Sequence, residues 1–390
     1  MAESLSMPRR RTKRGAERTP LKGDFDAVIC GASFAGLATA RELAGTGARV
    51  LVVDRYEIGE RQTSACAAPT EWLEAMGVAG SIRQTFGTLA VHTPHVSVRM
   101  HLPFTFSTFD YPSLCEQLWE QCDADFETAT VTGPAVGLAP VEVVTDRGRL
   151  RAPLVVDALG WRRVLAAETA EFQPPEAPLS RAIEVHPWGV SEDLEIWIDR
   201  SYVPAGYGWS FPAADEVRVG VGSFDPRHHV KEPTIRLAGD LEHEAIRFQG
   251  NWIPHRLRRA AENGAFYVGD SAGHCLPLTA EGIRTAFYFG IACGRELRRS
   301  VAGESSVEES LNRYAAFSAS HRWKFESLLR MQRLIPRVPP RLLAASLRAM
   351  STDAFVRFAF GHYLRIANPA YAREPGQRPE PRRRPVRLAA

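Results

Sequence analysis

A glycine-rich turn between two apolar segments constrains the fold of this chain more than any other feature. Residues 27–30 (AVIC) and 49–54 (RVLVVD) are short apolar runs typical of buried strands, and the turn GASFAG (31–36) follows the first run. A helix-forming stretch over residues 35–43 separates the turn from the second run. This order predicts a strand–helix–strand unit with a right-handed crossover, and therefore a parallel sheet.

The turn has the spacing of a dinucleotide-binding fingerprint, with Ser33 in place of the middle glycine. Gly31 permits a tight turn, Gly36 permits close packing of helix on sheet, and the helix N-terminus offers N–H groups to a pyrophosphate. Asp54 ends the second strand, where an acid binds an adenosine ribose. A turn that binds no ligand is the alternative, and the motif does not separate NAD from FAD. We predict a dinucleotide site made of Gly31, Ala32, Ser33, Ala35, Gly36, Asp54 and Arg55.

A second glycine-rich motif favours FAD. The segment YVGDSAG (267–273) completes an apolar run, and a helix follows it. A strand that ends in Gly269 and Asp270 places a carboxylate at the sheet edge, where ribityl hydroxyls can donate to it. Gly282 and Ile283 at the helix start present N–H groups to the electron-rich edge of an isoalloxazine ring. A chance Gly-Asp pair in a turn is the alternative interpretation.

An aromatic segment lies between these two motifs. Tyr207, Trp209 and Phe211 alternate in PAGYGWSFP, which places three rings on one face of a strand. Gly220 and Gly222 leave room on the following strand. Such a wall suits an isoprenoid or aromatic ligand above a flavin. The core stripe of an ordinary β-sheet is the alternative.

The motifs together resemble those of the FAD-dependent geranylgeranyl reductase family, which is related to the aromatic hydroxylases. The resemblance rests on GDSAGHCLPLTAEGIRTAF and on the YxWxFP and GxG pattern, and it extends over residues 24–335. It implies FAD as the cofactor and Asp270 as the ligand of its ribityl chain. We predict a substrate cavity lined by Tyr207, Trp209, Phe211 and Pro277.

Cys66 and His274 are the candidate catalytic residues. In reductases of the resembled family a Cys in the loop after the second strand lies near the flavin, although here QTSACAAPTEWL replaces the family's glycine-rich pattern. His274 follows the Gly-Asp motif, where it could supply a proton near the ring. A buried thiol and a structural histidine are the alternatives. We expect no metal, because the adjacent His228 and His229 point to different sides of any regular element.

The order of elements predicts an α/β protein, with a three-layer Rossmann-like FAD-binding domain, an inserted antiparallel β-sheet substrate domain and a helical C-terminal region. Ser306 and Glu309 form a capping box that opens one long helix reaching Leu328. The FAD-binding domain is expected at residues 23–165 and 262–300, the substrate domain at 166–261 with a contribution from 82–107, and the helical region at 301–372.

Basic residues gather at the two ends of the chain. The net charge of the 390 residues is +3, but residues 1–22 carry +5 and residues 373–390 carry +4, which leaves −6 for the middle. We expect two disordered basic tails, no nucleic-acid partner, and at most weak attraction to an anionic membrane surface. The six cysteines form no CxxC pair and no signal peptide is recognisable, so we expect a cytoplasmic protein.

The predicted function is reduction of C=C bonds in a hydrophobic, isoprenoid-type substrate by hydride transfer from reduced flavin. The segment 155–160 (VVDALG) departs from the motif by which the related hydroxylases bind FAD and NADPH, which favours a separate electron donor. An FAD-dependent monooxygenase, either an aromatic hydroxylase or halogenase-like, is one alternative, although the chain lacks a WxWxIP segment. A non-catalytic flavin-binding redox sensor is the other.

Overall fold

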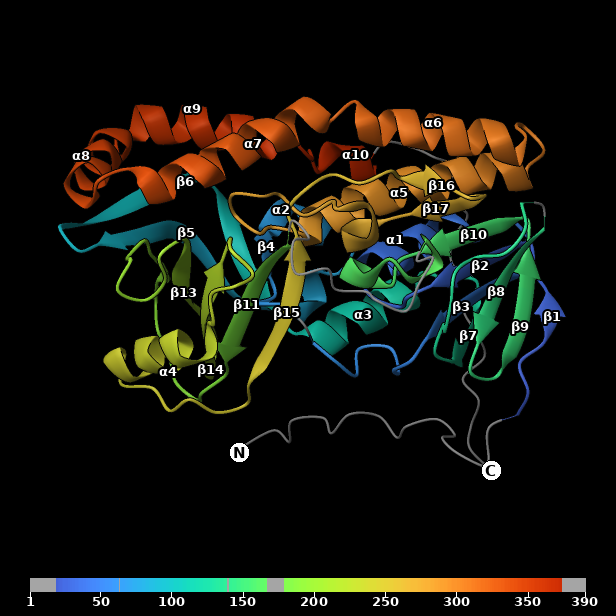
Figure 1. The fold of residues 1–390 in the computed structure, drawn as a ribbon, viewed down its shortest axis with the longest axis horizontal. Coiled ribbons are helices and arrows are strands. Elements are labelled where there is room, and N and C mark those ends of the chain that lie inside the picture. Colours follow the sequence, from blue (N-terminus) through green and yellow to red (C-terminus); the bar gives the residue numbers. More distant parts are fainter. Residues whose placement is uncertain (1–18, 63, 139, 167–178, 374–390) are drawn as a thin grey trace.

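Two large sheets and a row of helices build the molecule (Figure 1). This computed structural model describes residues 19–62, 64–138, 140–166 and 179–373. Helices α6, α7, α8 and α9 follow one another along one side of the molecule, at the top in Figure 1, above both sheets. Within the described ranges no helix is long and apolar enough to cross a membrane.

The first large sheet has six strands in the order β16-β17-β10-β2-β3-β7, and every pair except β16–β17 is parallel. All four residues of β2 are buried, because β2 lies inside the sheet and contacts both helix α1 (Phe34–Glu42) and strand β9 (Gly148–Ala152), and this explains its uninterrupted apolar run. The strands are β2 (Ala27–Cys30), β3 (Val50–Asp54), β7 (Asp125–Thr128), β10 (Leu154–Asp157), β16 (Ala261–Glu262) and β17 (Ala265–Tyr267).

Helix α1 (Phe34–Glu42) packs closely against helix α5 (Ile283–Val301), the helix that follows the second flavin motif. A Cβ atom at Gly290 would lie 2.8 Å from the carbonyl oxygen of Ala35, so only glycine allows this approach. Thr39 Oγ1 also donates to the Gly290 carbonyl across 3.1 Å. The two glycine-rich motifs are thereby held side by side. Helix α3 (Tyr111–Trp119) also contacts α1.

The second large sheet has eight strands in the order β15-β11-β14-β13-β12-β5-β6-β4, and only the β12–β5 pair is parallel. Strands β5 and β6, which come early in the chain, thus join strands that come much later. Helix α4 (Lys231–Asp240) packs its Leu237 on the valines of β11 and β14. The strands are β4 (Ala67–Pro69), β5 (Ile82–Thr93), β6 (Val96–Phe109), β11 (Leu179–Val185), β12 (Leu194–Trp197), β13 (Gly206–Ala213), β14 (Glu216–Ser223) and β15 (Gln249–Pro254).

A small third sheet of β1 (Gly23–Asp24), β9 (Gly148–Ala152) and β8 (Val141–Thr145) corrects the predicted N-terminal tail of residues 1–22. Leu21 is 8% exposed and its N–H donates to the Arg147 carbonyl across 2.8 Å. Folded chain therefore begins before residue 23, because packing against this sheet holds the residues ahead of β1. Residues 1–18 and 374–390 lie outside the described residues.

The predicted long helix after Ser306 is two helices, so that prediction was wrong. The capping box is present, since Ser306 Oγ accepts from the Glu309 N–H across 3.2 Å. The helix ends because Ser320 Oγ and His321 Nδ1 both contact the Phe317 carbonyl, in competition with the helical pattern. The remaining helices are α2 (Thr70–Ala75), α6 (Val307–Ala319), α7 (Arg322–Leu334), α8 (Pro340–Met350), α9 (Asp353–Leu364) and α10 (Ala370–Arg373).

Candidate flavin and substrate site

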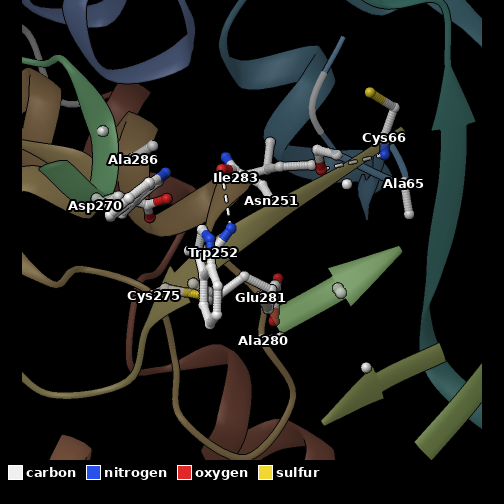
Figure 2. Close-up of a pocket in the computed structure, with 18 of the residues that line it drawn as sticks. Ala65, Cys66, Asn251, Trp252, Asp270, Cys275, Ala280, Glu281, Ile283 and Ala286 are labelled. Carbon is white, nitrogen blue, oxygen red and sulfur yellow. Dashed lines mark hydrogen bonds between the residues drawn. The ribbon is translucent and has the colours of Figure 1, made fainter. Parts of the chain in front are cut away.

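A large cavity lies between the two sheets and the helical layer, with a volume of about 1270 Å³. Its wall combines the turn after β2, the end of β3, the strands β11, β13 and β15, the segment before α5, and part of α9. Figure 2 shows Asp270, Ile283 and Trp252 on different elements around this space. The volume exceeds the roughly 300–1,000 Å³ of an ordinary small-molecule pocket, so a dinucleotide and a second ligand fit together.

The glycines of the fingerprint shape the cavity from behind its surface. Gly31 has a φ of +115°, and a Cβ there would lie 2.3 Å from the Ala158 carbonyl oxygen. A Cβ at Gly36 would lie 1.9 Å from the Gly31 carbonyl oxygen. Ser33 replaces the middle glycine without backbone strain, because its φ is −120°. Of the predicted residues in this turn, Ala32, Ser33 and Ala35 line the cavity.

Asp54 connects the end of β3 to the fingerprint turn. Its Oδ2 accepts from the Ala32 N–H across 2.8 Å and its Oδ1 from the Tyr56 N–H across 3.0 Å. Burial raises the pKa of the Asp54 carboxyl, and these two N–H groups offset part of the rise. Both Asp54 and Arg55 line the cavity, as an adenosine-ribose site requires.

Asp270 lies on the cavity wall, one turn after β17. Gly269 adopts a φ of +60°, which turns the chain at the end of the strand. Within the described ranges no group donates a hydrogen bond to the Asp270 carboxylate, and burial raises its pKa to about 6 despite the charge of Arg258. A carboxylate in this state is a ready acceptor for ligand hydroxyls. Gly282 and Ile283 line the same part of the cavity.

The three aromatic residues of β13 all line the cavity. Tyr207 Oη donates to the Thr279 carbonyl across 2.5 Å, which ties the aromatic wall to the second flavin motif. A Cβ at Gly220 would lie 2.2 Å from Trp209 Cζ2. The missing side chain at Gly220 therefore leaves room for the indole ring, as predicted from the sequence. Phe211 completes the wall.

A buried polar cluster behind this wall was not predicted from the sequence. Glu184 on β11 lines the cavity and accepts hydrogen bonds from Trp209 Nε1 across 3.1 Å, from His186 Nε2 across 2.9 Å and from Gln249 Nε2. Burial would raise the pKa of Glu184, but hydrogen bonding by His186 and Gln249 outweighs it and holds the pKa below its usual value. The available signal was the i, i+2 spacing of Glu184 and His186, which places both side chains on one face of a strand.

His274 and Pro277 do not reach the cavity wall. The chain turns at Gly273, whose φ is +66°, and directs His274 into the packing between α5 and α6. There its ring stacks on Phe289 with centroids 3.7 Å apart, and Nε2 pairs with Ser318 Oγ at 2.9 Å. Burial lowers the pKa of this imidazole. The Pro277 carbonyl accepts from a helix side chain instead of facing the cavity.

Cys66 belongs to the cavity wall, but its thiol is fully buried. Figure 2 shows the sulfur pointing away from Asn251 and Trp252. Arg218 Nη1 donates to the carbonyls of Ala65 and Cys66 across 2.9 and 3.1 Å, and so holds the loop that replaces the family's glycine-rich pattern. Burial raises the pKa of the Cys66 thiol well above its ordinary value, so the group stays protonated.

Asp157 lies in the segment 155–160, which departs from the FAD- and NADPH-binding motif of the related hydroxylases, and its role here is structural. It is fully buried and accepts from Ser271 Oγ across 2.6 Å and from the N–H groups of Leu159 and Leu165. These bonds fasten β10 to the second flavin motif. The cavity wall is made by the residues that follow, Ala158 to Gly160.

Comparison with curated proteins relates about three quarters of the chain to a digeranylgeranylglycerophospholipid reductase, although no family model matches the chain. Digeranylgeranylglycerophospholipid reductase 3 of Methanosphaera stadtmanae is 24% identical over 331 residues, which is 76% of this chain and 83% of that protein. The resemblance to geranylgeranyl reductases is confirmed. Shorter matches have higher identity: the Methanococcus vannielii digeranylgeranylglycerophospholipid reductase is 30% identical over 130 residues, but the match spans only 32% of that protein and 31% of this chain.

Solved structures confirm the predicted α/β flavoprotein fold. A geranylgeranyl bacteriochlorophyll reductase-like protein from Thermoplasma acidophilum has a TM-score of 0.77 at 16% identity, covering 90% of this chain and 98% of that one. PqsL from Pseudomonas aeruginosa, described as a probable FAD-dependent monooxygenase, has a TM-score of 0.63 at 17% identity, covering 84% and 100%. These relatives agree with a flavin as the cofactor of this reductase-like chain.

Proposed function

We propose that this chain is an FAD-dependent enzyme that reduces C=C bonds of a hydrophobic, isoprenoid-type substrate. The observation that carries the proposal is the single cavity that joins the fingerprint turn and Asp270 to the aromatic wall of β13. The named reductases among the relatives support the same reaction. We further propose that the protein acts in the cytoplasm.

The residues present fit FAD. The cradle around Gly31 and Gly36 has no room for side chains, and the α1 N-terminus opens into it, as a pyrophosphate requires. Asp54 would hold the adenosine ribose, and the free carboxylate of Asp270 would accept from the ribityl hydroxyls. Gly282 would direct N–H groups of α5 toward the ring. When bound and reduced, FAD supplies the hydride for the reaction.

The opposite end of the cavity suits a long apolar chain. Strands β5, β6 and β12 and helix α9 contribute mainly aliphatic and aromatic side chains there, and these exclude water from a bound hydrocarbon. This apolar part of the wall is formed by Leu89, Leu102, Phe106, Leu194, Ile196, Ile198 and Phe360.

Electron supply is proposed to come from a separate carrier. In the related hydroxylases the motif at the position of residues 155–160 helps to bind NADPH. Here Asp157 occupies that position, and its carboxylate accepts structural hydrogen bonds. A weak membrane contact through the basic ends remains a prediction, and most of those residues lie outside the described part of the chain.

An FAD-dependent monooxygenase is the second candidate. The fold similarity to PqsL, and to the flavin-dependent brominase Bmp2 at a TM-score of 0.57, favours this reading of the same cavity. The two activities differ in what reoxidises the reduced flavin: an alkene in one case and oxygen in the other.

The test uses the full-length protein loaded with FAD and reduced by dithionite without oxygen. We expect geranylgeranyl diphosphate to reoxidise the flavin and to yield a product with fewer double bonds, detected by mass spectrometry. Air without substrate should reoxidise the flavin slowly. Rapid formation of a flavin–oxygen adduct, followed by hydroxylation of an aromatic compound, would instead establish the monooxygenase.

A further inference from the structure

Reduction of an alkene needs a proton as well as a hydride, and the polar cluster behind the aromatic wall can supply it. We propose that Glu184 is the proton donor to the substrate and that His186 recharges it. This inference rests on the proposed reductase function. It concerns residues that neither the flavin motifs nor the aromatic motif includes.

Geometry holds Glu184 as a single conformer at the cavity wall. Trp209 Nε1 fixes Oε2 from one side, while His186 Nε2 and the Gln249 amide contact Oε1 from the other. The position is crowded as well, because a Cβ on the neighbouring Gly220 would lie 2.8 Å from Glu184 Cβ. Glu184 is therefore held in one orientation on the wall of the cavity that would contain the substrate.

His186 links Glu184 to the outside of the sheet. Its Nε2 faces Glu184 Oε1 at 2.9 Å, and its Nδ1 lies 3.7 Å from Glu216 Oε1 on the neighbouring strand β14. Glu216 in turn pairs with Arg247, whose side chain is 39% exposed. The four side chains therefore form a row from the cavity wall to solvent.

The charge arrangement keeps one mobile proton between Glu184 and His186. In the resting pair the ionised carboxylate of Glu184 accepts this hydrogen from His186 Nε2 across 2.9 Å, and Glu184 becomes an acid only when the proton moves onto Oε1. Among the described residues, Glu216, Arg218 and Cys66 are charged or titratable groups that face the pair. Arg218 is committed to Glu216 and to backbone carbonyls, and the Cys66 thiol is too weak an acid to compete.

A cavity wall that only had to fit the substrate would not need a buried Glu184–His186 pair. Burial of a carboxylate and an imidazole costs several kcal/mol for each charge unless they are paired and hydrogen-bonded, and apolar residues of the same size are often as stable. Glu184 is 3% exposed and His186 is 7% exposed. A pair that is expensive to bury and lies beside the proposed reaction site is a candidate for function.

Before the step, the proton on His186 Nε2 would transfer to Glu184 Oε1. Bound, reduced flavin would supply a hydride for one new C–H bond, and the proton now on Glu184 would form the other with the π electrons of the alkene. The substrate gains two electrons, the flavin loses them, and Glu184 becomes a carboxylate. A proton from solvent water at the Glu216 end would then restore His186 and return the pair to its resting state.

The test compares wild type, Glu184→Gln and His186→Asn as full-length proteins with FAD, reduced anaerobically and mixed with geranylgeranyl diphosphate. Loss of a general acid should slow flavin reoxidation about 10²–10⁴-fold in Glu184→Gln. We expect at least about a 10-fold loss in His186→Asn. FAD affinity and the rate of reduction by dithionite should stay close to wild type in both variants, although loss of the buried pair lowers the melting temperature. The wild-type rate should fall as the pH rises, and Glu184→Gln should lose that dependence.

Trp209→Phe is the matched control, because it removes the indole N–H and leaves both titratable groups in place. We expect it to slow reoxidation less than about 10-fold, the equivalent of one neutral hydrogen bond. Reoxidation of Glu184→Gln within threefold of wild type, or an unchanged pH profile, would overturn the relay and leave the reductase function intact. If reduced wild type does not react with the prenyl substrate, both proposals fail. Should Glu184→Gln not fold, His186→Asn decides in the same way.

Discussion

Individual residues at the site are adjusted for a ligand more than for stability, and Asp270 is the clearest case. A carboxylate on a cavity wall without a hydrogen-bond donor weakens the empty protein, because ionisation there is disfavoured. Its pKa of about 6 expresses that penalty. Ligand hydroxyls would relieve it, so Asp270 links flavin binding to the stability of the fold.

Asp270→Asn should therefore change stability and affinity in opposite directions. Because the folded state holds this proton more tightly than the unfolded chain, wild-type stability falls as the pH rises from about 4 to about 6. Above pH 6 the flavin-free variant should be more stable than wild type by about 1–3 kcal/mol, and the difference should vanish below pH 4. FAD affinity should drop about 10–100-fold.

Urea unfolding of flavin-free protein across this pH range and titration with FAD provide the two measurements. Asp193→Asn is the control, because Asp193 pairs with Arg99 outside the cavity wall. It should alter neither quantity. An Asp270→Asn protein that binds FAD as tightly as wild type would exclude Asp270 from the site.

At the scale of elements, a buried ion pair ties the start of α5 to the end of α9. Arg284 has a fully buried side chain, its Nε contacts Glu281 Oε1 at 2.5 Å, and its Nη atoms donate to the carbonyls of Tyr363 and Leu364 across 3.2 Å. Tyr363 also donates to Glu281. The second flavin motif and the helical layer are thus fixed to each other beside the cavity.

Glu281→Gln should destabilise the protein by about 3–5 kcal/mol, because it leaves the Arg284 charge buried without its partner. Tyr363→Phe removes only one hydroxyl from the same cluster and should cost about 1 kcal/mol. Denaturant unfolding of both variants measures the difference. Equal effects would mean that the cluster is held by hydrogen bonds and not by the ion pair.

At the scale of the whole molecule, the acidic middle of the chain contains the site and the basic ends flank it. Folded structure extends beyond the predicted boundaries: Leu21 is buried, and Arg373 pairs with Glu71 across 3.1 Å. A fragment of residues 19–373 therefore keeps the contacts that the structure describes at both ends of the chain.

A fragment of residues 19–373 should bind FAD as the full chain does. A fragment of residues 26–373 loses β1 and the buried side chains of Leu21 and Phe25, and should be less stable by at least about 3 kcal/mol. Flavin content after purification and urea unfolding test both fragments. If the 19–373 fragment lost FAD, residues outside this range would be needed for flavin binding.

The sequence by itself determined the features that depend on neighbours along the chain. The apolar runs of β2 and β3, the glycines at 31 and 36, and the alternation of Tyr207, Trp209 and Phe211 predicted strands, a dinucleotide turn and a cavity wall, because local periodicity and steric limits act over a few residues. The resemblance of the motifs added the expectation of a flavin and of similarity to geranylgeranyl reductases.

Tertiary structure decided what depends on pairing between distant segments. Gln249 and Glu216 join Glu184 and His186 only when β11 lies beside β15 and β14, a register that no local pattern encodes. His274 lies next to a flavin motif in sequence, yet a left-handed turn at Gly273 directs it into helix packing. Chain neighbours share an element, but contact across elements depends on strand order and on the direction of each turn, and these are set by the packing of the whole molecule.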